Sequence, residues 1–121
     1  MTFLRSSIPH FAADPAVRAF FETSLGYESI EDAPARRAST RKADLPFSRH
    51  LREAFEYLLR ERPCDVYEWS SLTGVAYEDE AHLYGYLQGL FDYLYEGAAE
   101  PPQAPDAEAP MPAWVDERWG R

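Results

Sequence analysis

Two pairs of side chains have the residue types and the spacing for metal chemistry. His50 with Glu53, and Asp79 with His82, are each three residues apart, so each pair would share one face of a helix. A metal site needs several such ligands, and the sequence lacks both paired cysteines and the His-Glu-x-x-His pattern. We therefore expect no metal and no other cofactor. A small metal-dependent enzyme that uses His50 and His82 remains an alternative.

Cys64, the only cysteine, is the other candidate for catalysis. It lies between Pro63 and Asp65, and a neighbouring carboxylate raises the pKa of a thiol and so opposes formation of the nucleophilic thiolate. Gly-rich phosphate loops, the Gly-x-Ser-x-Gly elbow and dinucleotide fingerprints are also absent from the sequence. We therefore predict no catalytic residue and a protein that is not an enzyme.

The expected compartment is the cytoplasm. A single cysteine cannot form an intramolecular disulfide, and this favours a reducing compartment. The first residues of the chain contain no continuous apolar stretch of signal-peptide length. No segment approaches the ~20 apolar residues of a membrane span, so we expect no membrane partner.

Carboxylates and tyrosines are concentrated between residues 65 and 84. The whole chain has a formal net charge of −9, from 21 acidic and 12 basic residues. Repulsion from phosphate disfavours direct nucleic-acid binding, so a basic protein is the expected partner. Rings would supply contact area and carboxylates would speed the encounter, although an ordinary acidic surface that keeps the protein soluble is an equal alternative. The predicted partner-binding residues are Glu68, Tyr77, Glu78, Asp79, Glu80, Tyr84, Trp114 and Trp119.

The segment Leu72-Thr73-Gly74-Val75 separates a short predicted helix from a longer one. This local pattern resembles the helix-turn-helix motif of DNA-binding proteins. The resemblance implies that the second helix enters the major groove by its first residues, which here are Glu78, Asp79 and Glu80. Their carboxylates would be repelled by phosphates, so we do not expect this helix to read a groove.

The elements that must position these residues are predicted to be helices. Asp14 can cap a first helix, Pro15 suits its first position, and Gly26 suits the left-handed residue after its end. Pro63 ends a second helix, and Asp65 caps a third that Gly74 ends. We predict an all-α bundle of about four helices, at 14–25, 46–62, 65–73 and 78–96.

The last helix has an unusually wide apolar side. Leu83, Leu87, Leu90 and Leu94 form one stripe, and tyrosines and a phenylalanine on both flanks widen the arc to about 200°. One neighbouring helix covers less than that. The helix is therefore either central in the domain or has a flank that is free for a partner.

The remaining segments are not helical by composition. Residues 27–43 change from acidic to basic without an apolar period, which predicts a long surface loop whose basic cluster either contacts a partner or pairs with the protein's own acidic face. Residues 98–112 are rich in Pro, Ala and Glu and predict an extended spacer between a domain at 1–97 and a tail at 113–121. Trp114 and Trp119 must be buried, either on the protein's own surface or on another protein.

The sequence as a whole favours a small acidic protein-binding module that occludes a basic partner, such as an immunity protein, an antitoxin, an inhibitor or a nucleic-acid mimic. One alternative is a structural or assembly subunit of a larger complex, either of a phage or of another kind, that docks through its tail. The other is the metal-dependent enzyme described above. The sequence does not identify the partner or the oligomeric state.

Overall fold

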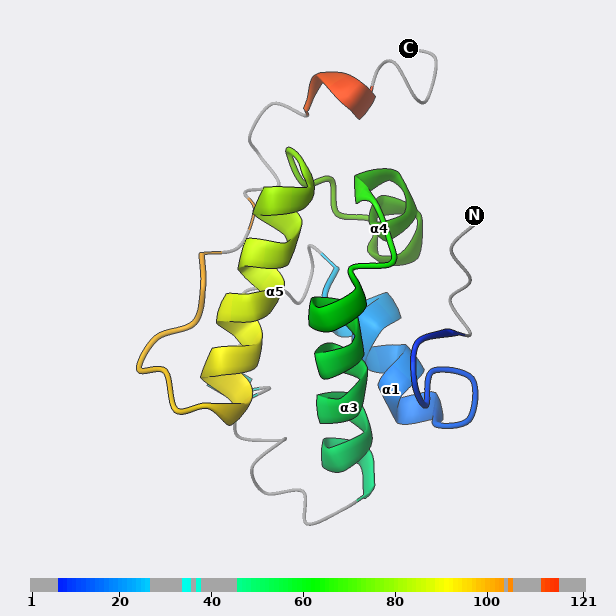
Figure 1. The fold of residues 1–121 in the computed structure, drawn as a ribbon, viewed down its shortest axis with the longest axis vertical. Helices are drawn as coiled ribbons and strands as arrows, with labels where there is room; N and C mark the ends of the chain where they lie inside the picture. Colours follow the sequence, from blue (N-terminus) through cyan, green and yellow to red (C-terminus); the bar gives the residue numbers. More distant parts are fainter. Residues whose placement is uncertain are drawn as a thin grey trace.

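The computed structural model describes residues 7–26, 34–35, 37, 46–103, 105 and 112–115, and within these residues it contains no strand. The predicted all-α fold is confirmed. The elements, in chain order, are α1 (Pro15–Ala19), η2 (Phe20–Ser24), α3 (Pro46–Glu61), α4 (Val66–Thr73) and α5 (Glu80–Tyr95). α3 lies between α1 and α5 and runs antiparallel to α5, while α4 lies across one end and contacts η2 (Figure 1).

Capping side chains fix where the helices begin, at the predicted caps Asp14 and Asp65 and also at Asp79, for which no cap was predicted. The Asp14 carboxylate accepts a hydrogen bond from the Ala16 N–H (2.9 Å), and the Asp79 carboxylate accepts one from the His82 N–H (2.8 Å). Asp65 does the same for α4, where a full capping box forms. Such caps satisfy backbone donors that have no partner within their own helix. The helix boundaries predicted from these residues are therefore confirmed to within a few residues.

The first helix ends differently from the prediction. α1 continues into η2, a π-helical turn in which the Leu25 N–H donates to the Phe20 carbonyl (3.2 Å). Gly26 does not adopt a left-handed conformation, so that prediction is wrong, whereas Gly74 and Gly97 both have a φ of 81°. A side chain at Gly26 would place its Cβ 3.3 Å from the Thr73 carbonyl oxygen. The glycine permits a close approach to the end of α4.

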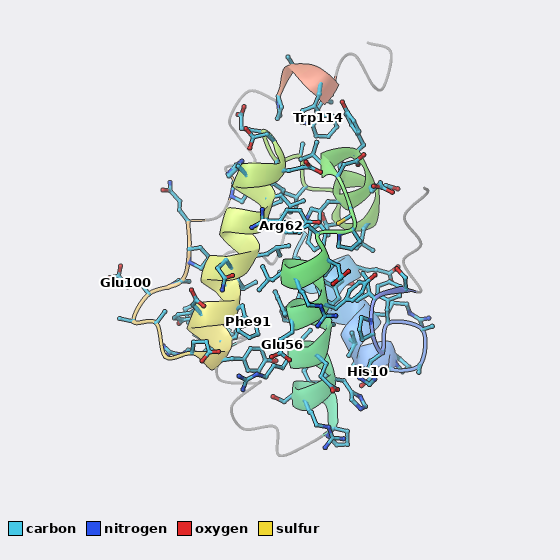
Figure 2. All side chains as sticks on the ribbon, viewed as in Figure 1. His10, Glu56, Arg62, Phe91, Glu100 and Trp114 are labelled. Carbon is cyan, nitrogen blue, oxygen red and sulfur yellow. The ribbon has the colours of Figure 1, made fainter. Side chains whose placement is uncertain are left out.

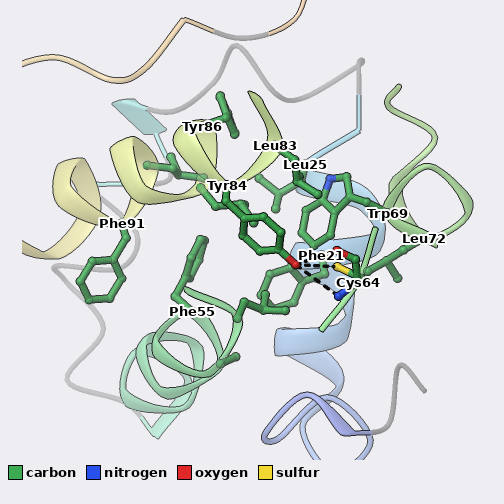
Figure 3. Close-up of a cluster of buried hydrophobic side chains, with 14 of the residues drawn as sticks. Phe21, Leu25, Phe55, Cys64, Trp69, Leu72, Leu83, Tyr84, Tyr86 and Phe91 are labelled. Carbon is green, nitrogen blue, oxygen red and sulfur yellow. Dashed lines mark hydrogen bonds between the residues drawn. The ribbon is translucent and has the colours of Figure 1, made fainter. Parts of the chain in front are cut away.

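α5 is central in the core, as the width of its apolar arc allowed. Its leucine stripe is buried, and so are the aromatic side chains on both flanks except for the half-buried Tyr95. Figure 3 shows side chains of α5 meeting aromatic rings from α3, α4 and η2. The buried residues of α5 are Leu83, Tyr84, Tyr86, Leu87, Leu90, Phe91, Tyr93 and Leu94.

The chain beyond α5 turns back along the outer side of that helix (Figure 1). Pro102 packs on Gly89 so closely that a Cβ at position 89 would lie 2.9 Å from the Pro102 Cβ. A short helical turn at 113–115 then lies near the start of α5. The predicted spacer is thus in contact with the helical body at one point at least. No helix in the described part of the chain has the length and apolar character needed to cross a membrane.

Candidate functional site

The charges of this chain are divided unevenly along the sequence. No Lys or Arg occurs between Arg62 and Arg118, while carboxylates occur throughout that stretch. The stretch contains α4, α5 and the returning segment. The acidity is therefore concentrated in one part of the molecule, a signal that the sequence contains and that net charge alone does not reveal.

The start of α5 presents the densest group of carboxylates in this stretch, which we call the carboxylate cluster: Glu78, Asp79 and Glu80. All three residues are exposed. Asp79 caps α5, while the Glu78 N–H donates to Nδ1 of His82 (3.1 Å). Within the described residues, no ion pair involves any of the three carboxylates. Part of this charge stabilises the positive end of the helix dipole, and the rest faces solvent.

Glu68 has a local structural role. Its Oε1 accepts a hydrogen bond from the Asp65 N–H (3.0 Å), and the Asp65 carboxylate accepts one from the Glu68 N–H (2.8 Å). This is the reciprocal capping box of α4. Glu68 is only partly exposed, so it contributes less free charge to the surface than its sequence position suggested.

Two of the predicted contact tyrosines are buried. Tyr77 is 1% exposed and Tyr84 is 2% exposed, so the expectation that these rings form a contact surface is wrong. Tyr77 packs against Tyr86 and against His82, with ring centroids 5.7 and 5.0 Å apart. Tyr84 belongs to the core because α5 has packing neighbours on both of its flanks, and Tyr77, which precedes α5, packs back onto that helix. Among the predicted contact residues between 65 and 84, the surface is therefore formed by carboxylates and not by rings.

The Tyr84 hydroxyl group joins α5 to the connection between α3 and α4. It accepts a hydrogen bond from the Cys64 N–H (3.2 Å) and donates one to the Cys64 carbonyl (2.8 Å), as Figure 3 shows. Burial raises the pKa of the Cys64 thiol to about 11, with a smaller contribution from Glu68 and Asp65. Burial also raises the pKa of Tyr84. Cys64 is therefore a neutral core residue, and the thiol is a poor nucleophile near neutral pH.

Trp114 is inserted into the protein's own fold. It is 9% exposed, and its indole N–H donates to the Tyr77 carbonyl (2.8 Å). The Tyr67 ring meets the indole edge to face, with centroids 5.0 Å apart at 84°. Figure 2 shows Trp114 pointing from the C-terminal turn toward α4 and the start of α5. We call this arrangement of the Tyr67 ring and the Tyr77 carbonyl the indole site.

The other predicted contact tryptophan, Trp119, lies outside the described residues. Of the basic cluster in the long loop, the structure describes only Arg37, whose guanidinium carbon lies 4.4 Å from the centre of the Tyr93 ring. The described residues of this segment, 34, 35 and 37, are helical, so the prediction of a non-helical loop is wrong there. At Arg37 the segment contacts the protein's own last helix. The remainder of the predicted loop is not tested.

The two histidines of the metal-enzyme alternative are not brought together. His50 lies in the first turns of α3 and His82 in the first turn of α5, and these antiparallel helices begin at opposite ends of the molecule (Figure 1). Within the described residues, no three His, Cys, Asp or Glu side chains form a group that could hold a metal ion. This arrangement gives the histidine pair no support as a shared metal site.

His50 stacks instead on His10, with ring centroids 3.9 Å apart. Each ring has a carboxylate partner: His50 Nδ1 lies 3.0 Å from Asp14 Oδ2, and His10 Nε2 lies 2.8 Å from Glu53 Oε1. The hydrogen bond with His50 lowers the pKa of the Asp14 carboxyl. Sequence spacing could not reveal this cluster, because it joins residues that lie far apart along the chain.

Comparison with known proteins assigns no family. No family model matches the chain, and neither the curated proteins nor the solved structures contain a significant match.

Proposed function

We propose that this chain is an acidic protein-binding module that covers a basic site on a partner protein, as an immunity protein, an antitoxin, an inhibitor or a nucleic-acid mimic does. The observation that supports the proposal most is the carboxylate cluster, because its exposed charges have no cationic partner among the described residues. The absence of Lys and Arg between Arg62 and Arg118 gives the surrounding stretch the same sign of charge.

The cluster is suited to binding because its backbone is held in place before a partner arrives. Asp79 caps α5, and the residues that follow are anchored by the buried leucine stripe. Glu78 and Glu80 can therefore meet Lys or Arg side chains without ordering a loop, which keeps the entropic cost of binding low. Charge-assisted hydrogen bonds would give affinity, and the surrounding negative field would speed association.

The assembly-subunit alternative depends on a tryptophan tail that is available to a neighbouring molecule. Trp114 is instead 9% exposed in its own fold. The exposed carboxylates therefore give the protein-binding module the stronger support.

The test begins with capture of partners from a lysate of the source cells, using the tagged full chain at low salt and mass spectrometry for identification. The captured protein is then purified and its Kd is measured for the wild type and for a Glu78→Lys, Glu80→Lys double variant. We expect the variant to bind at least about 100-fold more weakly, because each substitution replaces attraction by repulsion. Asp79 is left unchanged because it caps α5.

A Glu22→Lys, Glu56→Lys variant is the matched control. It alters the net charge equally, and both glutamates are exposed and belong to i,i+4 ion pairs on helices other than α5. We expect its Kd to stay within about threefold of the wild type. The proposal fails if the two double variants bind the partner equally well, or if added salt leaves the wild-type Kd unchanged.

A further inference from the structure

The indole site has two features that contact its occupant, and the carboxylate cluster lies next to it in sequence. Trp114 donates its N–H to the Tyr77 carbonyl, and its ring meets that of Tyr67. The carboxylate cluster begins at the residue that follows Tyr77. A tryptophan fits the two contact features, because phenylalanine has no N–H to donate and would leave a buried carbonyl without that donor.

The present occupant matches the site in shape and hydrogen bonding but not in charge. By sequence, the chain from 98 to 121 contains five carboxylate side chains and two cationic ones, Arg118 and Arg121, so it has a net negative charge. The spacer that precedes Trp114 contains no Lys or Arg. Negative charge on the tail therefore opposes the seating of Trp114 next to the carboxylate cluster. An occupant with Lys or Arg around its tryptophan would gain attraction where the tail meets repulsion.

We propose that the indole site is the docking point for a basic segment of the partner that carries a tryptophan, and that this segment displaces Trp114. The inference rests on the proposed function for the charge of the partner, and it adds the side chain that the partner inserts and the place where it inserts. A second copy of this chain is the poorer occupant, because its tail would bring the same carboxylates.

The tail then acts as a tethered competitor. Its effective concentration at the indole site is on the order of millimolar for a flexible connection of this kind. Removing Trp114 should therefore strengthen the binding of a free peptide. A change that loosens the contact between the tail and α5 should also strengthen binding of the free peptide, but by less. Gly89→Ala is such a change, because the new Cβ would lie 2.9 Å from the Pro102 Cβ.

The experiment measures binding of fluorescein-labelled peptides to the full-length protein by anisotropy. The probe is Lys-Ala-Trp-Val-Lys-Arg, and the controls are Lys-Ala-Ala-Val-Lys-Arg and the tail sequence Ala-Trp-Val-Asp-Glu-Arg. The Trp114→Ala variant should bind the probe at least about tenfold more tightly than the wild type does, and at least about tenfold more tightly than it binds either control. When Glu78→Gln and Glu80→Gln are added to the Trp114→Ala variant, the probe should bind about fivefold or more weakly than it binds to Trp114→Ala alone.

Equal binding of the probe and of the alanine peptide by Trp114→Ala would overturn the inference. So would equal or tighter binding of the tail peptide, which would make the site a receptor for this chain's own tail in a second copy. The indole N–H signal of Trp114 in the wild type provides a measurement that does not depend on the folding of a variant. The probe should shift that signal toward the value of an indole in water, and an unmoved signal at saturation contradicts displacement.

The two proposals can fail separately. If the natural partner needs Glu78 and Glu80 for binding but the Trp114 signal does not move, the proposed function holds and the indole site is not where the partner docks. If the probe displaces Trp114 but the Kd of the natural partner is insensitive to Glu78→Lys and Glu80→Lys, the indole site holds and the proposed function fails.

Discussion

The described residues before Pro63 and those after it are held together by different kinds of contact. In the first part, carboxylates meet cationic or imidazole groups, as in Arg18 with Glu22 and His50 with Asp14. In the second part, the joining contacts are neutral, as in Tyr84 with Cys64 and the Trp114 indole with a backbone carbonyl. A region with charge of one sign cannot pair that charge internally, so neutral contacts must stabilise it. Those of its carboxylates that neither cap a helix nor pair with a side chain, such as Glu78 and Glu80, stay available to other molecules.

One ion pair joins the two parts. Arg52 Nη2 on α3 lies 3.4 Å from Glu96 Oε1, just beyond the end of α5. The carboxylate cluster precedes the opposite end of that helix. The arginines of the first part thus reach one end of α5, and the other end keeps its free negative charge.

The neutral hydrogen bonds of Tyr84 should matter most for stability. Tyr84→Phe leaves the buried N–H and carbonyl of Cys64 without the hydroxyl group, which should lower the free energy of unfolding by about 3 kcal/mol in urea titrations. Tyr95→Phe is the control, because it removes one bond, to the Ser48 carbonyl, at a half-buried position. Similar losses in the two variants would show that the Tyr84 contact has no special weight.

The charged contact of Asp14 should show a pH dependence that the neutral contacts lack. Its pKa is lower when folded than when unfolded, so its contribution is present above the unfolded pKa of about 4 and disappears as the pH falls through the folded pKa. Asp14→Asn keeps a capping side chain and should cost about 1 kcal/mol at pH 7. Unfolding measured from pH 7 to pH 2 should show the two proteins converging, and a constant gap would contradict this account.

Gly85 and Gly89 lie on α5 one turn apart and distinguish free helix surface from surface that the returning chain covers. A Cβ at Gly85 would meet nothing within 4 Å, whereas one at Gly89 would meet Pro102 at 2.9 Å. Gly85→Ala should therefore raise the free energy of unfolding by about 1 kcal/mol, while Gly89→Ala should gain clearly less. Equal gains in thermal or urea unfolding would mean that the Pro102 contact contributes nothing.

The smallest effect should come from placing one cation in the acidic part. Gln88 is exposed and donates to the Asp92 carboxylate at 3.0 Å, so Gln88→Lys replaces an uncharged donor by a cationic one and forms an ion pair. We expect a gain of about 0.3 kcal/mol that added salt removes. Thr23→Lys, at an exposed position in the first part, should give no such gain. An equal gain there would weaken the contrast between the two parts.

Local chemistry made most of the fold predictable from the sequence. Asp14 and Asp65 cap helices as their positions predicted, and Gly74 adopts the left-handed conformation that was predicted to end the third helix. Each of these signals depends on residues within one turn. The width of the apolar arc of α5 predicted either a central helix or a helix with one flank free for a partner. The burial of both flanks shows that the helix is central.

The candidate site was less predictable, because its features depend on contacts between distant residues. The Tyr84 hydroxyl group binds Cys64, which lies 20 residues away along the chain, and the Trp114 indole donates to the Tyr77 carbonyl, 37 residues away. Spacing paired His50 with Glu53, but Glu53 binds His10. The uneven distribution of Lys and Arg was present in the sequence and would have directed attention to the carboxylates rather than to the tyrosines.

The π-helical turn of η2 limits which changes of length this chain tolerates. In a regular helix, neighbouring residues point about 100° apart, yet both Phe20 and Phe21 face the core. The wide turn accommodates one residue more than an α-helical turn would. Deleting a residue there would rotate one phenylalanine toward water and alter the direction in which the chain leaves the helix. A conservative exchange of either ring should be tolerated better than a deletion, so the first helix constrains residue number more tightly than residue identity.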